Sequence, residues 1–193
     1  YNAMIASALC RLERYSDLQV RNALDWINEN QPTKRNINVN LQGFRFDRFG
    51  GCFNDTPCYI GLVKSMIALQ YYKNRTKDSR YDIKLREGTE YMLQHKLFKR
   101  LSNSAPITRH ILDISFPESY HLNVVELIRF AHHAGILQDN RTTDLIQYLK
   151  SKQAKDGYWK IKFRYRAEGY TGFDKGKKSN EWITRIIRKS LNI

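Results

Sequence analysis

Cys58 is the residue whose type and position most directly suggest chemistry. It follows Thr56 and Pro57 and precedes a long apolar run. Because proline is common in the first turn of a helix, a helix is predicted to begin near residue 56. The partial positive charge of a helix N-terminus favours the thiolate of a cysteine, which is the form that attacks electrophiles and binds metals. Alternatively, Cys58 is a small buried residue of the core, as free cysteines often are.

Positive charge and aromatic rings gather towards the end of the sequence. Residues 150–189 contain thirteen Lys or Arg and four Asp or Glu, interleaved with aromatic residues such as Tyr158 and Trp159. The whole chain carries a formal net charge of +14, which favours an anionic partner: nucleic acid, an anionic membrane surface or a phosphorylated ligand. Basic and aromatic side chains together suit single-stranded nucleic acid, and they also suit an isoprenoid that carries a diphosphate. A solvated outer surface is the alternative.

Length and composition limit the class of protein. A chain of 193 residues is long enough for one domain with a substantial core. No apolar run approaches the ~18 residues that a membrane span needs, so no span is expected. The three cysteines, Cys10, Cys52 and Cys58, are too few and odd in number for a disulfide framework. This favours a reducing compartment, and therefore a cytoplasmic location.

Seven helices are predicted from apolar residues that recur with helical spacing. Ile5, Ala8 and Leu12, for example, fall at i, i+3 and i+7, as on one face of a helix. Pro117 is expected to open the fifth helix and Ser179 to cap the seventh. The predicted helices cover residues 2–14, 17–29, 56–72, 80–95, 117–134, 142–153 and 179–190.

The predicted helices are of two alternating kinds. The first, third and fifth are apolar on nearly every side, whereas the second, fourth and sixth are apolar on one side and charged on the other. A helix that is apolar all round must be buried by neighbours on both sides, and a one-sided helix forms an outer layer. The alternation predicts an all-α fold of stacked helical hairpins.

A short pattern recurs at the ends of the outer helices. It consists of an aromatic residue, an aliphatic residue, three further residues and a long polar side chain. The copies are Trp26-Ile27-x-x-x-Gln31, Tyr91-Met92-x-x-x-Lys96 and Tyr148-Leu149-x-x-x-Gln153. They recur at intervals of 65 and 57 residues, which suits one helix pair with its loop and supports an internal repeat.

The third copy continues as Gln153-x-x-x-Gly157-x-Trp159, and this stretch resembles the QW motif of squalene and oxidosqualene cyclases and their repeat relatives. The resemblance implies that Gln153 caps a helix end, where carbonyl groups lack partners. It also implies that Trp159 stacks on the glutamine amide and ties one hairpin to the next. Gly157 permits the tight reversal between them. An ordinary Asp-Gly turn beside a packed tryptophan is the alternative.

Three longer stretches extend the resemblance over nearly the whole chain. They are TPCYIGLVKSMIAL (56–69), FPESYHLNVVELI (116–128) and KKSNEWITRIIRKSL (177–191). In this order they look like uncharacterised prenyltransferase- or squalene cyclase-like proteins of bacteria and archaea. The resemblance implies an α/α toroid of the terpenoid cyclase and protein prenyltransferase superfamily, in which inner helices surround a central cavity.

The toroid resemblance implies a domain organisation. Residues 1–193 would form one toroid domain with repeat units at about 1–55, 56–116 and 117–178 and a final helix at 179–190. A full toroid has more helices than the seven predicted, so the chain is expected to be a half-toroid with an open edge or the C-terminal part of a longer protein. An open apolar edge near helices 2–14 and 179–190 would favour a homodimer or cover by further chain.

The resemblance also implies candidate site residues. Those expected to line the cavity are Cys58, Tyr59, Tyr120, His121 and Trp182. Protein prenyltransferases bind zinc through an Asp and a Cys at one inner helix start and a His at a later one, which implies Asp55, Cys58 and His121 as a zinc set with an open fourth position. In those enzymes one residue separates the Asp from the Cys, whereas two separate them here. No cofactor is therefore expected, and zinc is the alternative.

These residues predict a toroid-type protein that binds an apolar, isoprenoid- or lipid-like small molecule, with catalysis left open. Squalene-type cyclisation is not expected, because the sequence lacks the Asp-x-Asp-Asp cluster of the cyclases. A zinc-dependent, prenyltransferase-like transferase is one alternative function. A basic helical-repeat scaffold for nucleic acid or another anionic polymer is the other.

Overall fold

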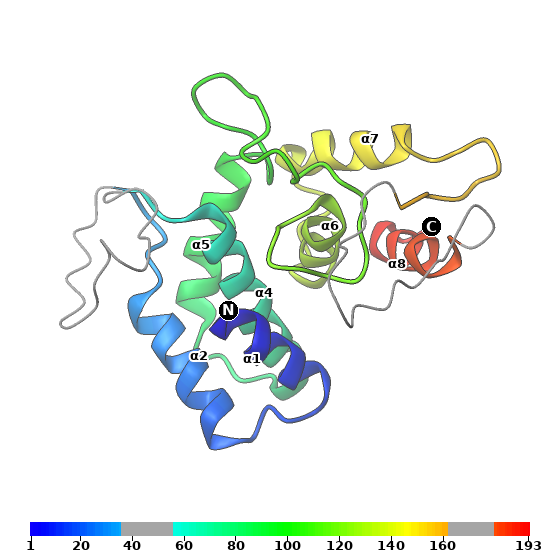
Figure 1. Cartoon of the computed structure of the whole chain (residues 1–193). Helices are drawn as coiled ribbons and strands as arrows, with labels where there is room; N and C mark the ends of the chain where they lie inside the picture. Colours follow the sequence, from blue (N-terminus) through cyan, green and yellow to red (C-terminus); the bar gives the residue numbers. More distant parts are fainter. Residues whose placement is uncertain (36–55, 162–179) are drawn as a thin grey trace. The chain divides into compact units, whose positions relative to one another are not determined.

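The computed structural model describes residues 1–35, 56–161 and 180–193. Within these ranges the chain forms seven α-helices and one short 3-10 helix, and no strand (Figure 1). The predicted all-α fold is confirmed, while the toroid arrangement stays a prediction. No helix in the described ranges is long and apolar enough to cross a lipid bilayer.

The chain divides between Met92 and Leu93 into two compact units. The first unit contains α1 (Asn2–Arg11), α2 (Leu18–Asn30), α4 (Tyr59–Thr76) and most of α5 (Asp82–Gln94). The second contains α6 (Val124–His133), the 3-10 helix η1 (Asn140–Thr142), α7 (Thr143–Ser151) and α8 (Glu181–Leu191). The predicted single toroid domain and its repeat units stay a prediction.

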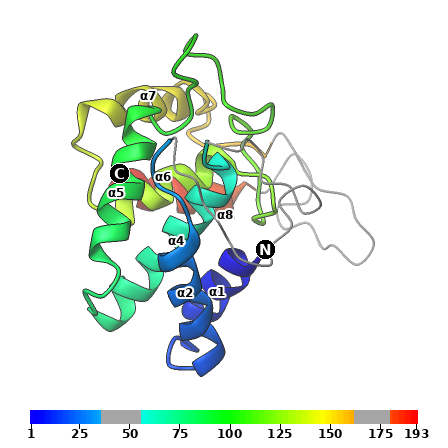
Figure 2. The ribbon, with the colours of Figure 1, turned by 90° about the vertical axis from the view of Figure 1, so that its left-hand side faces the viewer.

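α4 is the central helix of the first unit. Every residue from 62 to 70 is buried, and nine consecutive residues cover all sides of a helix, so α4 has neighbours all round. α1 and α2 pack against α4 and against each other, and Figure 2 shows these two helices side by side. α5 approaches α4 closely, because a Cβ placed on Gly88 would lie 2.1 Å from Sδ of Met66. The third helix is therefore an inner helix, as predicted.

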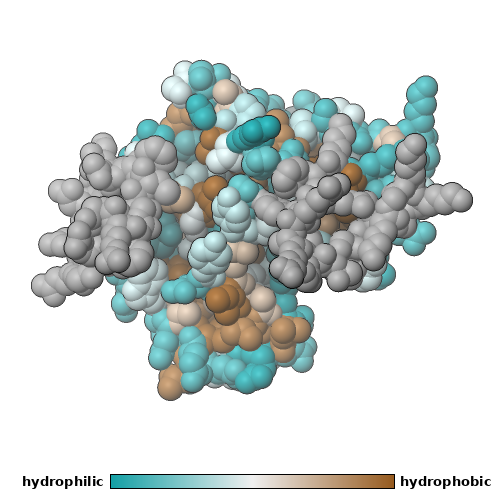
Figure 3. Space-filling model, viewed as in Figure 1, coloured by the Kyte–Doolittle hydropathy of each residue, from teal (hydrophilic) through white to brown (hydrophobic). Residues whose placement is uncertain are grey.

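α1 differs from the prediction. The sequence indicates a helix that is apolar nearly all round with Ile5 and Leu12 on its packing face, but these two side chains are 58% and 71% exposed. The residues that α1 buries are Ala3, Ala6, Ser7 and Cys10. The small side chains face the core, and Figure 3 shows hydrophobic atoms gathered over the outer side of α1. The first helix is therefore one-sided within the described part of the chain.

The second unit is built around α6. All residues from Val124 to Ile128 are buried, which again covers every side of the helix. α7 and α8 both pack against α6. α7 buries only Leu145 and Leu149, so the predicted contrast between an inner fifth helix and an outer sixth helix is confirmed.

Two predicted helix starts are wrong. The fifth helix begins at Val124 and not at Pro117, because Oδ1 of Asn123 accepts hydrogen bonds from the backbone N–H groups of Val125 and Glu126 at 2.9 and 3.2 Å. An asparagine side chain in the N-cap position pairs backbone N–H groups that the start of a helix leaves without partners. The third helix begins at Tyr59, with Cys58 in the N-cap position. Ser179, the predicted cap of the last helix, lies outside the described residues.

Candidate functional site

The candidate residues of the first unit lie at the start of α4. Cys58 occupies the N-cap, and its thiol is free and half-buried. Tyr59 is buried, and burial, together with a smaller effect of the nearby Tyr91, raises the pKa of its hydroxyl well above the usual value. Tyr59 therefore remains neutral and packs in the core, with its ring centroid 6.5 Å from that of Tyr91. Asp55 lies outside the described residues.

The candidate residues Tyr120 and His121 lie in the second unit, in a group that also contains His110 and Asp113. We call these four residues the imidazole cluster. The ring centroids of Tyr120 and His121 are 3.9 Å apart, and those of His121 and His110 are 4.7 Å apart. Nδ1 of His110 lies 2.7 Å from Oδ2 of Asp113. Three rings and one carboxylate therefore meet just before α6.

The fold holds the His110–Asp113 turn from both sides. Ile111 and Ile114, which lie on either side of Leu112 and Asp113 in the sequence, are fully buried. The backbone N–H of Asp113 donates to the carbonyl of His110 at 3.1 Å, which closes the turn. From α7, the hydroxyl of Tyr148 donates to the carbonyl of Leu112 at 2.8 Å. Two buried anchors and two hydrogen bonds thus fix the positions of the imidazole and the carboxylate.

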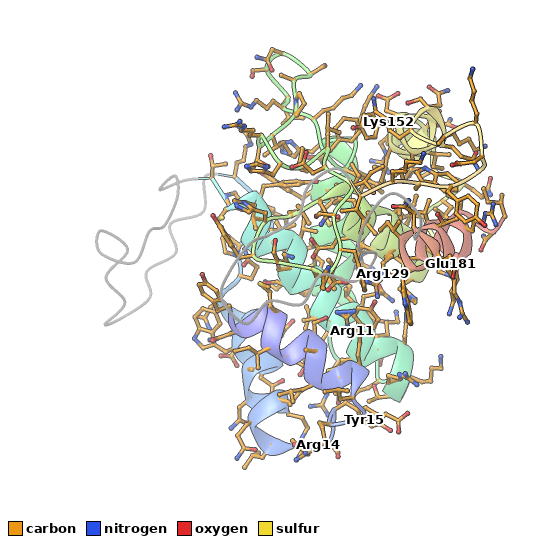
Figure 4. The ribbon with its side chains drawn as sticks, turned by 45° about the vertical axis from the view of Figure 1, so that its right-hand side comes forward. Arg11, Arg14, Tyr15, Arg129, Lys152 and Glu181 are labelled. Atoms are coloured by element: carbon orange, nitrogen blue, oxygen red, sulfur yellow. The ribbon has the colours of Figure 1, made fainter. Side chains whose placement is uncertain are left out.

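Tyr148 supports this turn as a neutral hydrogen-bond donor. Burial, and to a lesser extent the charge of Asp113, raises the pKa of its hydroxyl. The ammonium of Lys152 lies 5.0 Å from the centre of the Tyr148 ring, a cation–π distance, and Figure 4 labels this lysine near the end of α7. Tyr148 therefore stays protonated and keeps its bond to the turn at neutral pH.

A second tether holds the loop that carries Tyr120 and His121. Arg129, which extends from α6 (Figure 4), forms an ion pair with Glu118. The backbone N–H of His121 donates to Oγ of Ser119 at 3.2 Å. The loop is thereby joined to the inner helix, which positions the two rings of the imidazole cluster that it contributes.

The predicted zinc set is not assembled by the described residues. No group of three His, Cys, Asp or Glu side chains within these ranges is arranged to hold a metal ion. Cys58 belongs to the first unit and His121 to the second, and Asp55 is not described. The absence of a cofactor and the alternative of zinc both stay predictions.

Trp182, the remaining cavity candidate, lies in the first turn of α8. Its side chain is exposed, while the neighbouring Ile183 and, one turn on, Ile187 are fully buried. α8 packs against α6, so Trp182 stands apart from the buried face of its helix. Its role in lining a cavity stays a prediction. In the basic stretch 150–189, residues 162–179 lie outside the described ranges.

The turn that contains Gln153, Gly157 and Trp159 joins α7 to α8. Gly157 has a φ of +80°, a conformation that glycine adopts without strain. Trp159 is completely buried, and its indole N–H donates to the carbonyl of Leu149 at 2.7 Å. Its backbone N–H donates to Oγ1 of Thr184 in α8 at 3.0 Å. Trp159 therefore ties the end of α7 to α8, while the stacking on the Gln153 amide that the QW resemblance implies stays a prediction.

The role implied for Gln153 is wrong in one respect. Its side-chain amide is exposed and donates to the carbonyl of Gly157 at 3.0 Å, and thus closes the turn. The helix-end carbonyl of Leu149 is bonded by the indole of Trp159 instead. In the two earlier copies of the pattern the aliphatic residues Ile27 and Met92 are buried like Leu149, so the aliphatic position is the part of the pattern with a common structural role.

Sequence reasoning missed His110 and Asp113. They lie in the stretch between the predicted fourth and fifth helices, where no regular period indicates which side chains meet. The available signal was local: a His and an Asp three residues apart, with Ile111 and Ile114 beside them. Apolar residues in an otherwise polar loop indicate anchors to the core, and a turn held by such anchors can bring the two polar side chains together.

Comparison of the chain with protein-family models, with curated proteins and with solved structures gives no match.

Proposed function

We propose that this chain is a helical-hairpin protein of the terpenoid cyclase and prenyltransferase type that binds an apolar, isoprenoid- or lipid-like ligand. The observation that supports the proposal best is the turn at Trp159, whose buried indole and backbone join α7 to α8. The resemblance assigns this linking role to the tryptophan. A cytoplasmic location belongs to the same proposal.

The burial pattern of the helices gives further support. α4 and α6 are buried on every side, whereas α2 and α7 bury a single face. Inner and outer helices of this kind are what a layered hairpin protein requires, because only the inner helices have neighbours on both sides. Ligand sites in helical proteins commonly lie between such helices.

Aromatic side chains provide surface for an apolar ligand. Tyr120 and Trp182 are each about half exposed, and exposed aromatic rings bury a large area at low cost in side-chain entropy when a ligand covers them. The two histidines and the carboxylate of the imidazole cluster would meet the polar end of such a ligand. The proposed ligand thus has an apolar body and a polar head group.

Calorimetric titration with three probes tests the proposal: farnesol, farnesyl diphosphate and inorganic diphosphate. We expect both isoprenoids to bind with a negative heat-capacity change, which is the signature of apolar burial. Inorganic diphosphate should bind at least tenfold more weakly than farnesyl diphosphate, a difference of about 1.4 kcal/mol. If neither isoprenoid binds, or if inorganic diphosphate binds as tightly as farnesyl diphosphate, the proposal is wrong.

A further inference from the structure

The His110–Asp113 pair has the geometry of an oriented base. Nδ1 of His110 and Oδ2 of Asp113 are 2.7 Å apart, and an ionised carboxylate can only accept a hydrogen bond. The hydrogen of a neutral His110 is therefore on Nδ1, and the lone pair of the ring is on Nε2. A carboxylate that fixes the tautomer of a histidine in this way is the arrangement that makes Nε2 a proton acceptor.

The pair is held by the fold and is not a casual surface contact. Surface ion pairs stabilise a protein by little, so two side chains gain almost nothing from meeting unless the backbone brings them together. Here the backbone does so, because Ile111 and Ile114 are buried on either side of Asp113 and Tyr148 bonds the carbonyl between them. The imidazole and the carboxylate are thus pre-positioned, as a proton-transfer group must be.

The surroundings suit a proton acceptor that a ligand can reach. The side chains of His110 and Asp113 are 27% and 29% exposed, so the pair is open to solvent without being fully solvated. The ring of His121 lies 4.7 Å from that of His110, and Tyr120 lies beyond it. The group that offsets the positive charge which His110 acquires on taking a proton is the carboxylate of Asp113, whose Oδ2 lies 2.7 Å from Nδ1.

We propose that His110 is a proton acceptor oriented by Asp113, and that its substrate class is a small ligand with a hydroxyl or thiol group, or a water molecule, placed against Nε2. In the step, the O–H or S–H bond breaks, the proton moves to Nε2, and the oxygen or sulfur keeps the electron pair as a nucleophile. The charge of Asp113 balances the imidazolium that forms. The proton later returns to the leaving group or to solvent.

The tautomer of His110 is the first test. Long-range proton–nitrogen NMR of the histidine-labelled full chain distinguishes the two neutral tautomers. We expect His110 to carry its hydrogen on Nδ1, and Asp113→Ala to shift it toward the Nε2–H form. A wild-type His110 that carries its hydrogen on Nε2 would overturn the proposal.

The second test measures proton transfer with p-nitrophenyl acetate as the probe, since a base that activates water speeds its hydrolysis. We expect wild-type protein to exceed the rate of His110→Gln by roughly 100-fold, the lower range for general base catalysis, and Asp113→Ala to fall at least tenfold. His132→Gln, at the end of α6, is the matched control and should keep the full rate. Equal rates for wild type and His110→Gln, or an equal loss in His132→Gln, would overturn the proposal.

Discussion

Replacement of Trp159 is the sharpest test of how the second unit is held together. The side chain is 0% exposed, and a buried tryptophan removes roughly 200 Å² from water. At about 25 cal/mol/Å² this burial stabilises by about 5 kcal/mol, an upper value because the unfolded chain already buries some of the ring. With the indole hydrogen bond included, we expect Trp159→Ala to lower the free energy of unfolding by about 3–5 kcal/mol.

The conservative variant separates packing from hydrogen bonding. Trp159→Phe keeps most of the apolar area but removes the indole N–H that bonds the carbonyl of Leu149 at 2.7 Å. That carbonyl also accepts from the backbone N–H of Lys152 at 3.0 Å, so it is not left without a donor. The expected loss is therefore smaller, about 1–2 kcal/mol.

Urea unfolding followed by circular dichroism measures both losses, and Trp182→Ala provides the matched control. Trp182 is the same residue type on α8, but its side chain is 54% exposed, so its replacement should change the free energy of unfolding by about 0.5 kcal/mol or less. If Trp159→Ala changes it by no more than the control does, Trp159 does not join α7 to α8 in the way described.

Three further predictions concern stability. Tyr81→Phe removes the hydroxyl that donates to Oδ1 of Asp25 at 2.6 Å, and should lower the free energy of unfolding by about 1–2 kcal/mol; an unchanged urea midpoint would contradict this. Gly88→Ala would place a Cβ 2.1 Å from Sδ of the buried Met66. Overpacking costs about 1–3 kcal/mol and outweighs the gain in helix propensity of about 1 kcal/mol, so the variant should be less stable than wild type. A higher melting temperature would refute the close approach of α5 to α4. Hydrogen bonds from Arg141 lower the pKa of the Asp139 carboxyl from 3.8 to about 2. The ionised carboxylate therefore stabilises the folded chain above pH 3.8, and this stabilisation is lost as the pH falls through 2. Asp139→Asn should therefore cost about 1 kcal/mol at pH 7, allowing for solvent screening, and the difference from wild type should shrink between pH 4 and 2; a constant difference would be the contrary result.

The inner helices were predictable because their sequences place apolar residues on every side of the helix. A run such as residues 62–70 contains apolar residues on every side of the helix, and burial by neighbours all round is the only stable arrangement. The same reasoning applies to α6. In α2 and α7 the apolar residues lie on one side only, which predicts that a single face is buried. Periodicity therefore predicts the all-α fold class and the inner or outer position of α2, α4, α6 and α7.

Periodicity failed at α1, where size and not hydrophobicity decides which face is buried. The stripe of Ile5 and Leu12 is the more apolar one, yet Ala3, Ala6 and Cys10 face the core. Small side chains let two helix backbones approach each other closely, and α1 packs against α4 and α2 through this face. A hydrophobic pattern ranks faces by transfer energy alone and cannot register that gain in close packing.

The imidazole cluster was only half predictable for a different reason. Tyr120 and His121 are neighbours in the sequence, and this adjacency alone predicts that they lie close together. Their meeting with His110 depends on a loop whose path is set by two buried isoleucines and by a hydroxyl from α7. Such contacts between segments distant in sequence have no repeating pattern, and only the folded chain brings them together.

The Trp159 turn shows how a motif can name the right residues and misassign the donor. The carbonyl of Leu149 lies at a helix end, where it accepts from the backbone N–H of Lys152 and keeps a second lone pair for a donor from outside the helix. Both the amide of Gln153 and the indole of Trp159 could supply a hydrogen. Gln153 is exposed, so its amide can bond water equally well and gains little by turning inward. The indole N–H of the buried Trp159 has no access to water, and leaving it unpaired would cost about 1–3 kcal/mol. The buried group therefore takes the helix-end carbonyl, and the exposed amide is left to close the turn at Gly157.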